Sequence, residues 1–245
     1  MLLRALVPNG VVNWYRRRAI GKQRAINSGR SRQDIFQSVY AGNQWGGAAG
    51  EFCSGSGSSE EQSLAYVRFV RTFVEEQGIT SVVDLGCGDF RVGRQLIMPG
   101  VRYTGIDIVP GLIQANQRAY GAEQVQFLCR DICAEGVPEA ELLLVRQVFQ
   151  HLSNDEILAA LGRMPSFRFA LVTEHHPAPD RLRIHNSDKP HGPDTRVVDG
   201  SGVFLDHPPF SLQARVVMRV PVQQPLVGPG EVLATCLVTP GGRDS

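Results

Sequence analysis

The spacing of apolar side chains predicts one helix followed by alternating strands and helices. From residue 66 to residue 74, apolar side chains recur at i, i+3, i+4, i+7 and i+8, on one face of a helix. Beyond Gly78, short β-like runs alternate with helical runs: strands over 81–85, 102–107, 125–129, 142–145 and 168–173, helices over 91–97, 110–120 and 154–161. This alternation is typical of right-handed βαβ units, so we expect a doubly wound α/β fold with a mostly parallel sheet.

The pattern changes after residue 173. Residues 174–211 are rich in His, Pro, Asp and Gly and show little periodicity, so we expect a long insertion on the substrate side of the domain. Two β-like runs follow, over 212–220 and 231–239, with the turn Val227-Gly-Pro-Gly230 between them. Because no helical pattern separates these runs, we expect them to form an antiparallel pair at the edge of the sheet.

Two N-terminal segments differ from this regular part. Residues 1–33 contain no acid, and Trp14 and Tyr15 stand just before the basic cluster 16–18. This composition is typical of a disordered or loosely docked leader, and also of a segment with weak contact to an anionic membrane surface. Residues 34–59 combine many Gly and Ser residues with four aromatic ones, which favours an ordered N-terminal lid over a flexible linker (Phe36, Tyr40, Trp45, Phe52).

The overall composition excludes several classes of protein. A net charge of +1 does not provide the basic surface of a nucleic-acid-binding domain, so no nucleic-acid partner is expected. The five cysteines include no C-x-x-C pair, which argues against a zinc site or a disulfide framework. Since no apolar run approaches the roughly 18 residues of a membrane span, we expect a cytoplasmic protein. The sequence does not indicate an oligomeric state.

The strongest chemical signal is a glycine turn after the first predicted strand, in Val82-Val-Asp-Leu-Gly86-Cys-Gly88. Glycines at such a turn allow a nucleotide-like ligand to approach the backbone. The second strand ends at Asp107, 21 residues after Gly86, where a carboxylate can accept hydrogen bonds from both ribose hydroxyls. The third strand leads to Asp131-Ile132, where the acid can meet an adenine amino group and the isoleucine its ring. Together these strand ends predict a nucleoside pocket.

Asp84 distinguishes between two kinds of cofactor. A carboxylate just before the glycine turn would repel the pyrophosphate of a nicotinamide cofactor, whereas it would attract the sulfonium and ammonium groups of S-adenosylmethionine. In addition, Arg91 stands where the third glycine of a dinucleotide fingerprint would be. A nicotinamide-dependent oxidoreductase remains an alternative, as does a non-catalytic module that binds S-adenosylmethionine.

The motifs Asp84-Leu-Gly-Cys-Gly88, Gly105-Ile-Asp107, Asp131-Ile132 and Arg146-Gln-Val-Phe-Gln-His151 resemble those of the class I S-adenosylmethionine-dependent methyltransferases. The resemblance implies a Rossmann-like, doubly wound seven-stranded sheet with an antiparallel last strand, in a methyltransferase domain over residues 60–245. It assigns the cofactor to Asp84, Gly86, Cys87, Gly88, Asp107, Ile108, Asp131, Ile132 and Arg146. Gln147 departs from the pattern, since relatives often have an acid there.

A second, looser resemblance concerns the flanks. The residues Phe36, Tyr40, Trp45-Gly46 and Ser54-Gly-Ser-Gly-Ser58, together with the segment 201–210, are similar to a bacterial subgroup of small-molecule or polysaccharide-associated methyltransferases. This similarity implies an acceptor that is a small molecule or a saccharide, methylated on a hydroxyl group. Methylation of RNA or protein is disfavoured, because the predicted core has no aromatic and basic platform for RNA.

Catalytic residues are expected beyond the fourth and fifth strands, beside the methyl group. A base would assist an oxygen nucleophile, and the candidates are His151, Glu174 and His175. His151 also precedes the helix cap Ser153, so it is equally well interpreted as a packed or capping histidine. Five histidines between 175 and 207 raise a metal site as an alternative, but none has the i, i+4 spacing of a helical metal motif, and no metal is expected.

Overall fold

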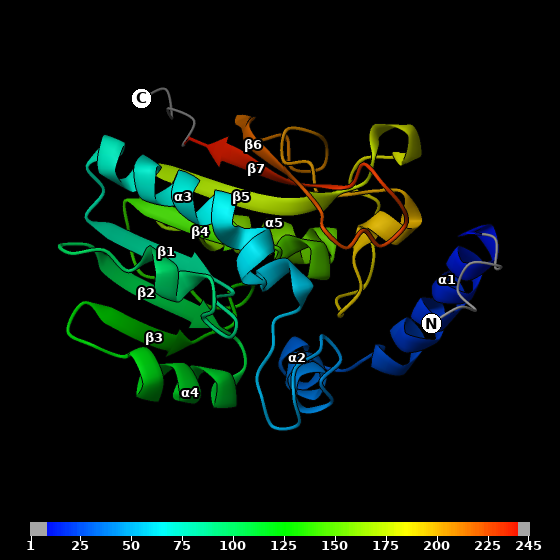
Figure 1. Cartoon of the computed structure of the whole chain (residues 1–245), viewed down its shortest axis with the longest axis horizontal. Coiled ribbons are helices and arrows are strands. Elements are labelled where there is room, and N and C mark those ends of the chain that lie inside the picture. Colours follow the sequence, from blue (N-terminus) through cyan, green and yellow to red (C-terminus); the bar gives the residue numbers. More distant parts are fainter. Residues whose placement is uncertain (1–8, 240–245) are drawn as a thin grey trace.

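The structure is a computed structural model that describes residues 9–239. Its centre is one seven-stranded sheet with the strand order β3-β2-β1-β4-β5-β7-β6 (Figure 1). The strands are β1 (Ser81–Leu85), β2 (Arg102–Asp107), β3 (Val125–Cys129), β4 (Leu142–Arg146), β5 (Phe169–His176), β6 (Ala214–Pro221) and β7 (Val232–Val238). The first five are parallel, and β7 lies antiparallel to both β5 and β6. The predicted fold class is confirmed.

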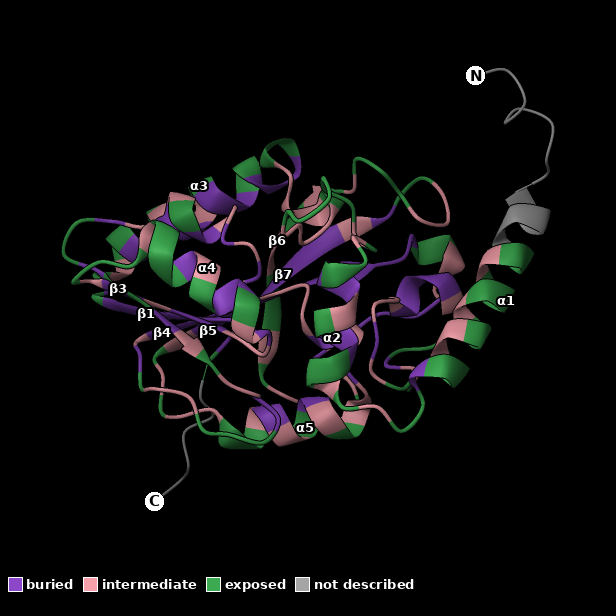
Figure 2. Cartoon of the chain, turned by 90° about the horizontal axis from the view of Figure 1, so that it is seen from below, coloured by how far each residue is buried: buried purple, intermediate pink, exposed green. Residues whose placement is uncertain are grey.

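Helices cover both faces of this sheet. Alternate strand residues point to opposite sides, so apolar side chains on both faces are buried beneath helices. On one face, α3 (Glu60–Gln77) and α4 (Pro110–Tyr120) pack through residues such as Val70 and Ile113 on Val82 and Leu144. On the other face, α5 (Asn154–Arg163) packs through Ile157 on a second apolar cluster (Figure 2). The sheet is therefore buried on both faces. The glycine turn and the acids at the strand ends lie at its carboxyl edge.

Capping residues set the limits of these helices. Ser59 accepts a hydrogen bond from the Gln62 N–H at the start of α3, and Gly78, in the left-handed conformation, ends that helix. Ser153 and Glu156 form a capping box at the start of α5. The prediction of a helix over 91–97 is wrong. This segment forms only the short 3-10 turn η3 (Gly93–Leu96). A side chain at Gly93 would lie 2.4 Å from the Phe90 ring, so η3 is pressed against the core.

The N-terminal part contains two further helices, α1 (Asn9–Asn27) and α2 (Arg32–Ala41). Arg24 of α1 forms ion pairs with Asp194 and Asp199, at 2.7 and 2.8 Å. Arg32 of α2 forms ion pairs with Asp131 and Glu156, both at 2.6 Å. Residues 9–27 are thus helical, and these pairs tie the N-terminal segment to the domain, where the sequence suggested a loosely docked leader. No described helix is long and apolar enough to cross a membrane.

Candidate cofactor and acceptor site

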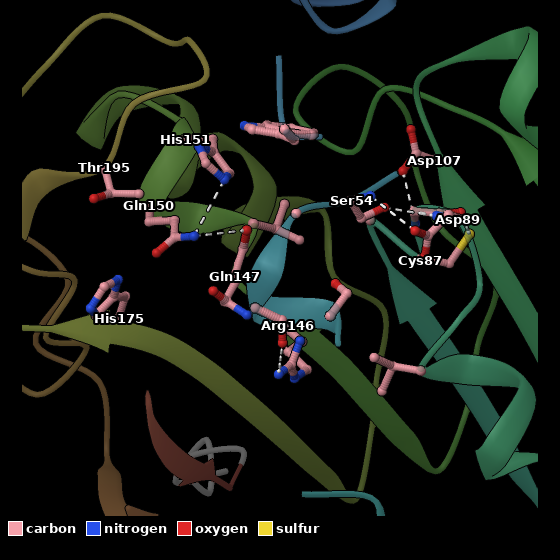
Figure 3. Close-up of a pocket in the computed structure, with 18 of the residues that line it drawn as sticks. Ser54, Cys87, Asp89, Asp107, Arg146, Gln147, Gln150, His151, His175 and Thr195 are labelled. Atoms are coloured by element: carbon pink, nitrogen blue, oxygen red, sulfur yellow. Dashed lines mark hydrogen bonds between the residues drawn. The ribbon is translucent and has the colours of Figure 1, made fainter. Parts of the chain in front are cut away.

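A cavity of about 340 Å³ opens at the carboxyl ends of β1, β2, β4 and β5. All the residues to which the resemblance assigned the cofactor line it, namely Asp84, Gly86, Cys87, Gly88, Asp107, Ile108, Asp131, Ile132 and Arg146. Figure 3 shows two ends of this cavity: Asp107, Cys87 and Ser54 at one, and Gln150, His175 and Thr195 at the other. We refer to these as the cofactor end and the acceptor end.

The glycine turn leaves no room for side chains. Gly86 has a φ of 74°, and an added Cβ would lie 2.4 Å from a methyl group of Val148. Gly88 has a φ of 56°, and an added Cβ would lie 2.4 Å from Ser54 Oγ. The N–H groups of Gly86 and Cys87 both donate to Ile106 O, which ties the turn to β2. The turn therefore needs glycine for its conformation and for the close approach of its neighbours.

Asp107 lies at the end of β2 and supports this turn. Its carboxylate accepts the Gly88 N–H and the Val109 N–H, both at 3.1 Å. Burial raises the pKa of Asp107 to about 6, although these backbone hydrogen bonds act in the opposite direction. A carboxylate oxygen has more than one lone pair, so Asp107 can accept further hydrogen bonds from a ligand in the cavity.

Asp84 and Arg146 lie deeper, at the ends of β1 and β4. Asp84 accepts a 2.6 Å hydrogen bond from the Tyr103 hydroxyl, and burial raises the pKa of Asp84 to about 6. The Arg146 guanidinium lies 5.2 Å from the centre of the Tyr66 ring and donates from Nη2 to Gly57 O at 2.7 Å. Among the described residues, buried Arg146 Nε has no hydrogen-bond partner. An anionic group of a ligand would satisfy it.

The end of β3 contributes Asp131 and Ile132 to the cavity wall. The carboxylate of Asp131 is already bound by Arg32 and by the Cys133 N–H, at 2.6 and 2.9 Å. These bonds fix its orientation. A contact from Asp131 to an adenine amino group stays a prediction.

Residues 36–59 cover the cavity from outside. Ser54 exchanges two hydrogen bonds with Asp89, each at 2.9 Å, and its hydroxyl also lies 2.9 Å from the Tyr40 hydroxyl (Figure 3). Trp45 packs edge-on against Tyr40, with the ring centres 5.4 Å apart. Sequence reasoning assigned this segment to a lid but did not single out Ser54. The segment is ordered by named contacts, and its opening as a lid stays a prediction.

The acceptor end contains two candidate bases. His151 Nδ1 lies 3.2 Å from Gly192 O, which fixes the proton on Nδ1 because a carbonyl only accepts. Burial, assisted by the nearby Lys189, lowers the pKa of His151 to about 4, so its ring is neutral. Its Nε2 accepts from Gln150 Nε2 at 3.3 Å, and the ring lies beside Trp45, tilted by 39° with 5.2 Å between centres.

Glu174 does not line the cavity, which corrects its prediction as an acceptor contact. Its carboxylate lies beneath the turn after β4, where it accepts the N–H groups of Val148, Phe149 and Gln150 at 3.2, 2.9 and 3.0 Å. Burial raises the pKa of Glu174 to about 7. Glu174 is therefore a positioning residue that holds the segment leading to His151.

His175 lines the cavity and has a partner that the sequence did not reveal. Its Nε2 lies 2.8 Å from Glu231 Oε2, and the side chains of both residues are buried. The other ring nitrogen, Nδ1, makes no hydrogen bond to any described residue. The adjacent His176 points to the other side of the strand, where it bonds Val203 O and stacks on Phe204.

The remaining histidines of the insertion are dispersed. His185 stacks on His207, with the ring centres 3.9 Å apart, and His191 pairs with Glu156 at 2.8 Å. Across residues 9–239, no three His, Cys, Asp or Glu side chains converge so as to hold a metal ion.

Residues 82–167 match a family model described as "Methyltransferase domain". The match spans the glycine turn, Asp107, Asp131 and the turn after β4, all of which contribute to the cavity lining. Residues 82–167 are thus similar to a methyltransferase domain, and the sheet has the strand order expected from the resemblance to class I methyltransferases. The cofactor is S-adenosylmethionine.

Solved structures of similar fold include several methyltransferases, whereas no curated protein matches the sequence. NodS from Bradyrhizobium japonicum WM9, an N-methyltransferase in complex with S-adenosyl-L-homocysteine, is 17% identical, with a TM-score of 0.49 over 74% of this chain and 88% of that one. Human N-acetylserotonin methyltransferase is 15% identical, with a TM-score of 0.45 over 87% and 61%. Magnesium protoporphyrin IX methyltransferase from Synechocystis PCC 6803 is 15% identical, with a TM-score of 0.42 over 96% and 100%.

The cavity of the methyltransferase domain fits this cofactor chemically. The glycine cradle excludes side chains, so a nucleoside can lie against the backbone. Asp107 offers acceptors for ribose hydroxyls, Asp84 a buried carboxylate for a cation, and Arg146 Nε a donor for a carboxylate. The residues present therefore fit a ligand that has both a cationic and an anionic group.

Proposed function

We propose that the methyltransferase domain methylates a hydroxyl group of a small molecule or a saccharide, with His175 as the base. The observation that carries the proposal is the pair formed by His175 and Glu231 at the cavity wall. Glu231 also accepts the N–H groups of Leu226, Val227 and Gly228, at 2.8, 2.5 and 2.9 Å. These contacts fix both the position and the charge of its carboxylate.

The charge of Glu231 determines which nitrogen of His175 is free. Burial alone would raise the pKa of Glu231, but the hydrogen bonds from His175 and the backbone outweigh it and lower the pKa to about 2. An ionised carboxylate only accepts, so His175 Nε2 carries a proton and donates it to Glu231. In the neutral ring, Nδ1 then has the lone pair that can take the proton of an acceptor hydroxyl.

The side chain of Gln150 favours a methyl acceptor that carries hydrogen-bond donors such as hydroxyl groups. Its Nε2 donates hydrogen bonds to His151 Nε2 and to Gln147 O. These bonds orient the amide so that its Oε1 can accept a hydrogen bond from a ligand. Within the described chain, Gln150 Oε1 and Thr195 Oγ1 are buried without any partner. Leaving such atoms unsatisfied costs roughly 1–3 kcal/mol each, so a bound hydroxyl group would be favoured at this end.

The apolar part of the acceptor end is aromatic. Phe36 and Trp45 form a cluster with the His151 ring, at 6.2 and 5.2 Å from it between centres and 6.1 Å from each other, and both line the cavity. Flat aromatic faces pack on the apolar face of a sugar or on another ring. Aromatic faces together with unsatisfied hydrogen-bond acceptors support a hydroxylated ring as the methyl acceptor.

Bound S-adenosylmethionine supplies an electrophilic methyl group on a positively charged sulfur. The residues of the chain then hold the hydroxyl oxygen in line, exclude water and accept the hydroxyl proton at His175 Nδ1. Positioning of this kind contributes about 7–11 kcal/mol in favourable cases, and a base roughly 10²–10⁴-fold in rate.

The test compares acceptors and variants. Purified protein is incubated with S-adenosylmethionine and panels of saccharides, phenols and amines, and S-adenosylhomocysteine formation is measured. We expect turnover with a hydroxylated acceptor, and we expect His175→Ala to reduce it by roughly 10²–10⁴-fold with cofactor affinity almost unchanged. His185→Ala, at an exposed histidine outside the cavity, is the matched control. Turnover with amines alone, or full activity of His175→Ala, would contradict the proposal.

A further inference from the structure

Helix α1 presents an outward face that combines aromatic and basic side chains. Trp14, Tyr15 and Ile26 are 54%, 64% and 65% exposed, and Arg18 and Lys22 are exposed between them. At 3.6 residues per turn, these five side chains fall within an arc of about 120°. Figure 2 shows this side of α1 as largely exposed, away from the body of the protein.

The opposite side of α1 is held by the protein itself. Arg24 pairs with Asp194 and Asp199, Arg17 Nε donates to Val198 O at 2.9 Å, and Arg16 donates to Leu226 O. The segment 194–199 includes Thr195, which lines the acceptor end of the cavity. Because several contacts fix the inner side, the outer face has a defined orientation relative to the domain.

All charged side chains in residues 1–33, which include this face of α1, are basic. No acid occurs in residues 1–33, whereas basic residues occur at eight positions (Arg4, Arg16, Arg17, Arg18, Lys22, Arg24, Arg30, Arg32). The Arg18 guanidinium lies 5.6 Å from the Trp14 ring, so cation and aromatic ring share one patch. Trp and Tyr favour the interface between water and lipid, and basic side chains favour anionic headgroups.

We propose that this face of α1 docks on an anionic membrane surface. Interfacial helices have this combination of an exposed aromatic and apolar side with interleaved basic residues and no acids. In the sequence, the residues before the helix include the apolar Leu2, Leu3, Leu6 and Val7. A nucleic-acid partner would need a larger basic surface, and the net charge of the chain is only +1.

Vesicle sedimentation of the full chain tests the proposal. Vesicles of phosphatidylcholine alone are compared with vesicles of phosphatidylcholine and phosphatidylglycerol in equal parts. We expect the protein to sediment with the anionic vesicles only, and more weakly at high salt. The double variant Arg18→Glu and Lys22→Glu should reduce partitioning by roughly thirtyfold or more, from the loss of two cations near an anionic surface.

The matched control reverses two exposed arginines elsewhere, Arg68→Glu on α3 and Arg118→Glu on α4, and should sediment like the wild type. A second measurement uses Trp45→Phe, which leaves Trp14 as the single tryptophan, and its emission should shift to the blue with anionic vesicles. Absence of sedimentation, equal loss in both double variants, or binding to RNA in place of vesicles would overturn the proposal. Methyl transfer to a soluble acceptor does not depend on this surface.

Discussion

Replacement of Asp107 tests the placement of the cofactor ribose. In the structure, its carboxylate accepts two backbone N–H groups at 3.1 Å and faces the cavity. Asp107→Ala removes the acceptors of the ribose hydroxyls and also releases the Gly88 N–H of the glycine turn. Hydrogen bonds to a charged group contribute about 1.5–3 kcal/mol, so cofactor affinity should fall by roughly 10- to 150-fold.

Asp107→Asn refines this prediction because an amide has the same shape but a single acceptor oxygen. Whichever way the amide turns, its NH₂ group faces either the Gly88 N–H or the Val109 N–H, where the wild type has an acceptor. We therefore expect a loss for Asn that lies between the wild type and Ala.

Isothermal titration with S-adenosylhomocysteine measures these affinities, and thermal melts without ligand show whether each variant is folded. The matched control is Asp155→Ala, at an exposed carboxylate on α5 outside the cavity. Wild-type affinity in a folded Asp107→Ala variant would refute the placement of the ribose at the end of β2.

Three further predictions follow from the same contacts. Burial raises the pKa of both Asp84 and Asp107 to about 6, and the cofactor is expected to bind their ionised forms. Titrations at several pH values should therefore show constant cofactor affinity above about pH 7. Below about pH 6, the affinity should fall by up to roughly tenfold per pH unit for each of the two groups. Gly86→Ala should cost at least about 1–2 kcal/mol in urea unfolding, because its φ is 74° and the new Cβ would meet Val148, whereas Gly162→Ala has open space and should not destabilise. Arg32→Met should lower the melting temperature by roughly 2–4 °C, since it removes the ion pairs to Asp131 and Glu156, and an unchanged melt would show that these pairs contribute nothing.

The sheet and the cofactor end could be predicted because both depend on local signals. Strands β1, β2 and β3 begin and end where the apolar pattern placed them, and the glycine turn with Asp107 follows directly from strand ends on one edge. In contrast, β5 runs to His176, beyond its predicted end at 173, because it pairs with β7 along its whole length. Such an extension depends on a neighbour that is distant in the sequence.

The acceptor end was predicted only in part, for the same reason. His175 and Glu231 are 56 residues apart and meet only because β5 and β7 are antiparallel neighbours. Similarly, Arg32 and Asp131 are 99 residues apart, so the link between α2 and the end of β3 has no local signal. Glu174 and His175 are neighbours within β5, but alternate strand residues point to opposite faces, and Glu174 points beneath the turn after β4.

A crystal structure of the complex with S-adenosylhomocysteine tests the central claim most directly. We predict that the ribose hydroxyls bond Asp107, that the carboxylate of the ligand lies near Arg146 Nε, and that the sulfur faces the acceptor end with Gln150 and His175. Density for the ligand elsewhere on the protein, or a ligand in the cavity with its sulfur turned away from His175, would contradict the account.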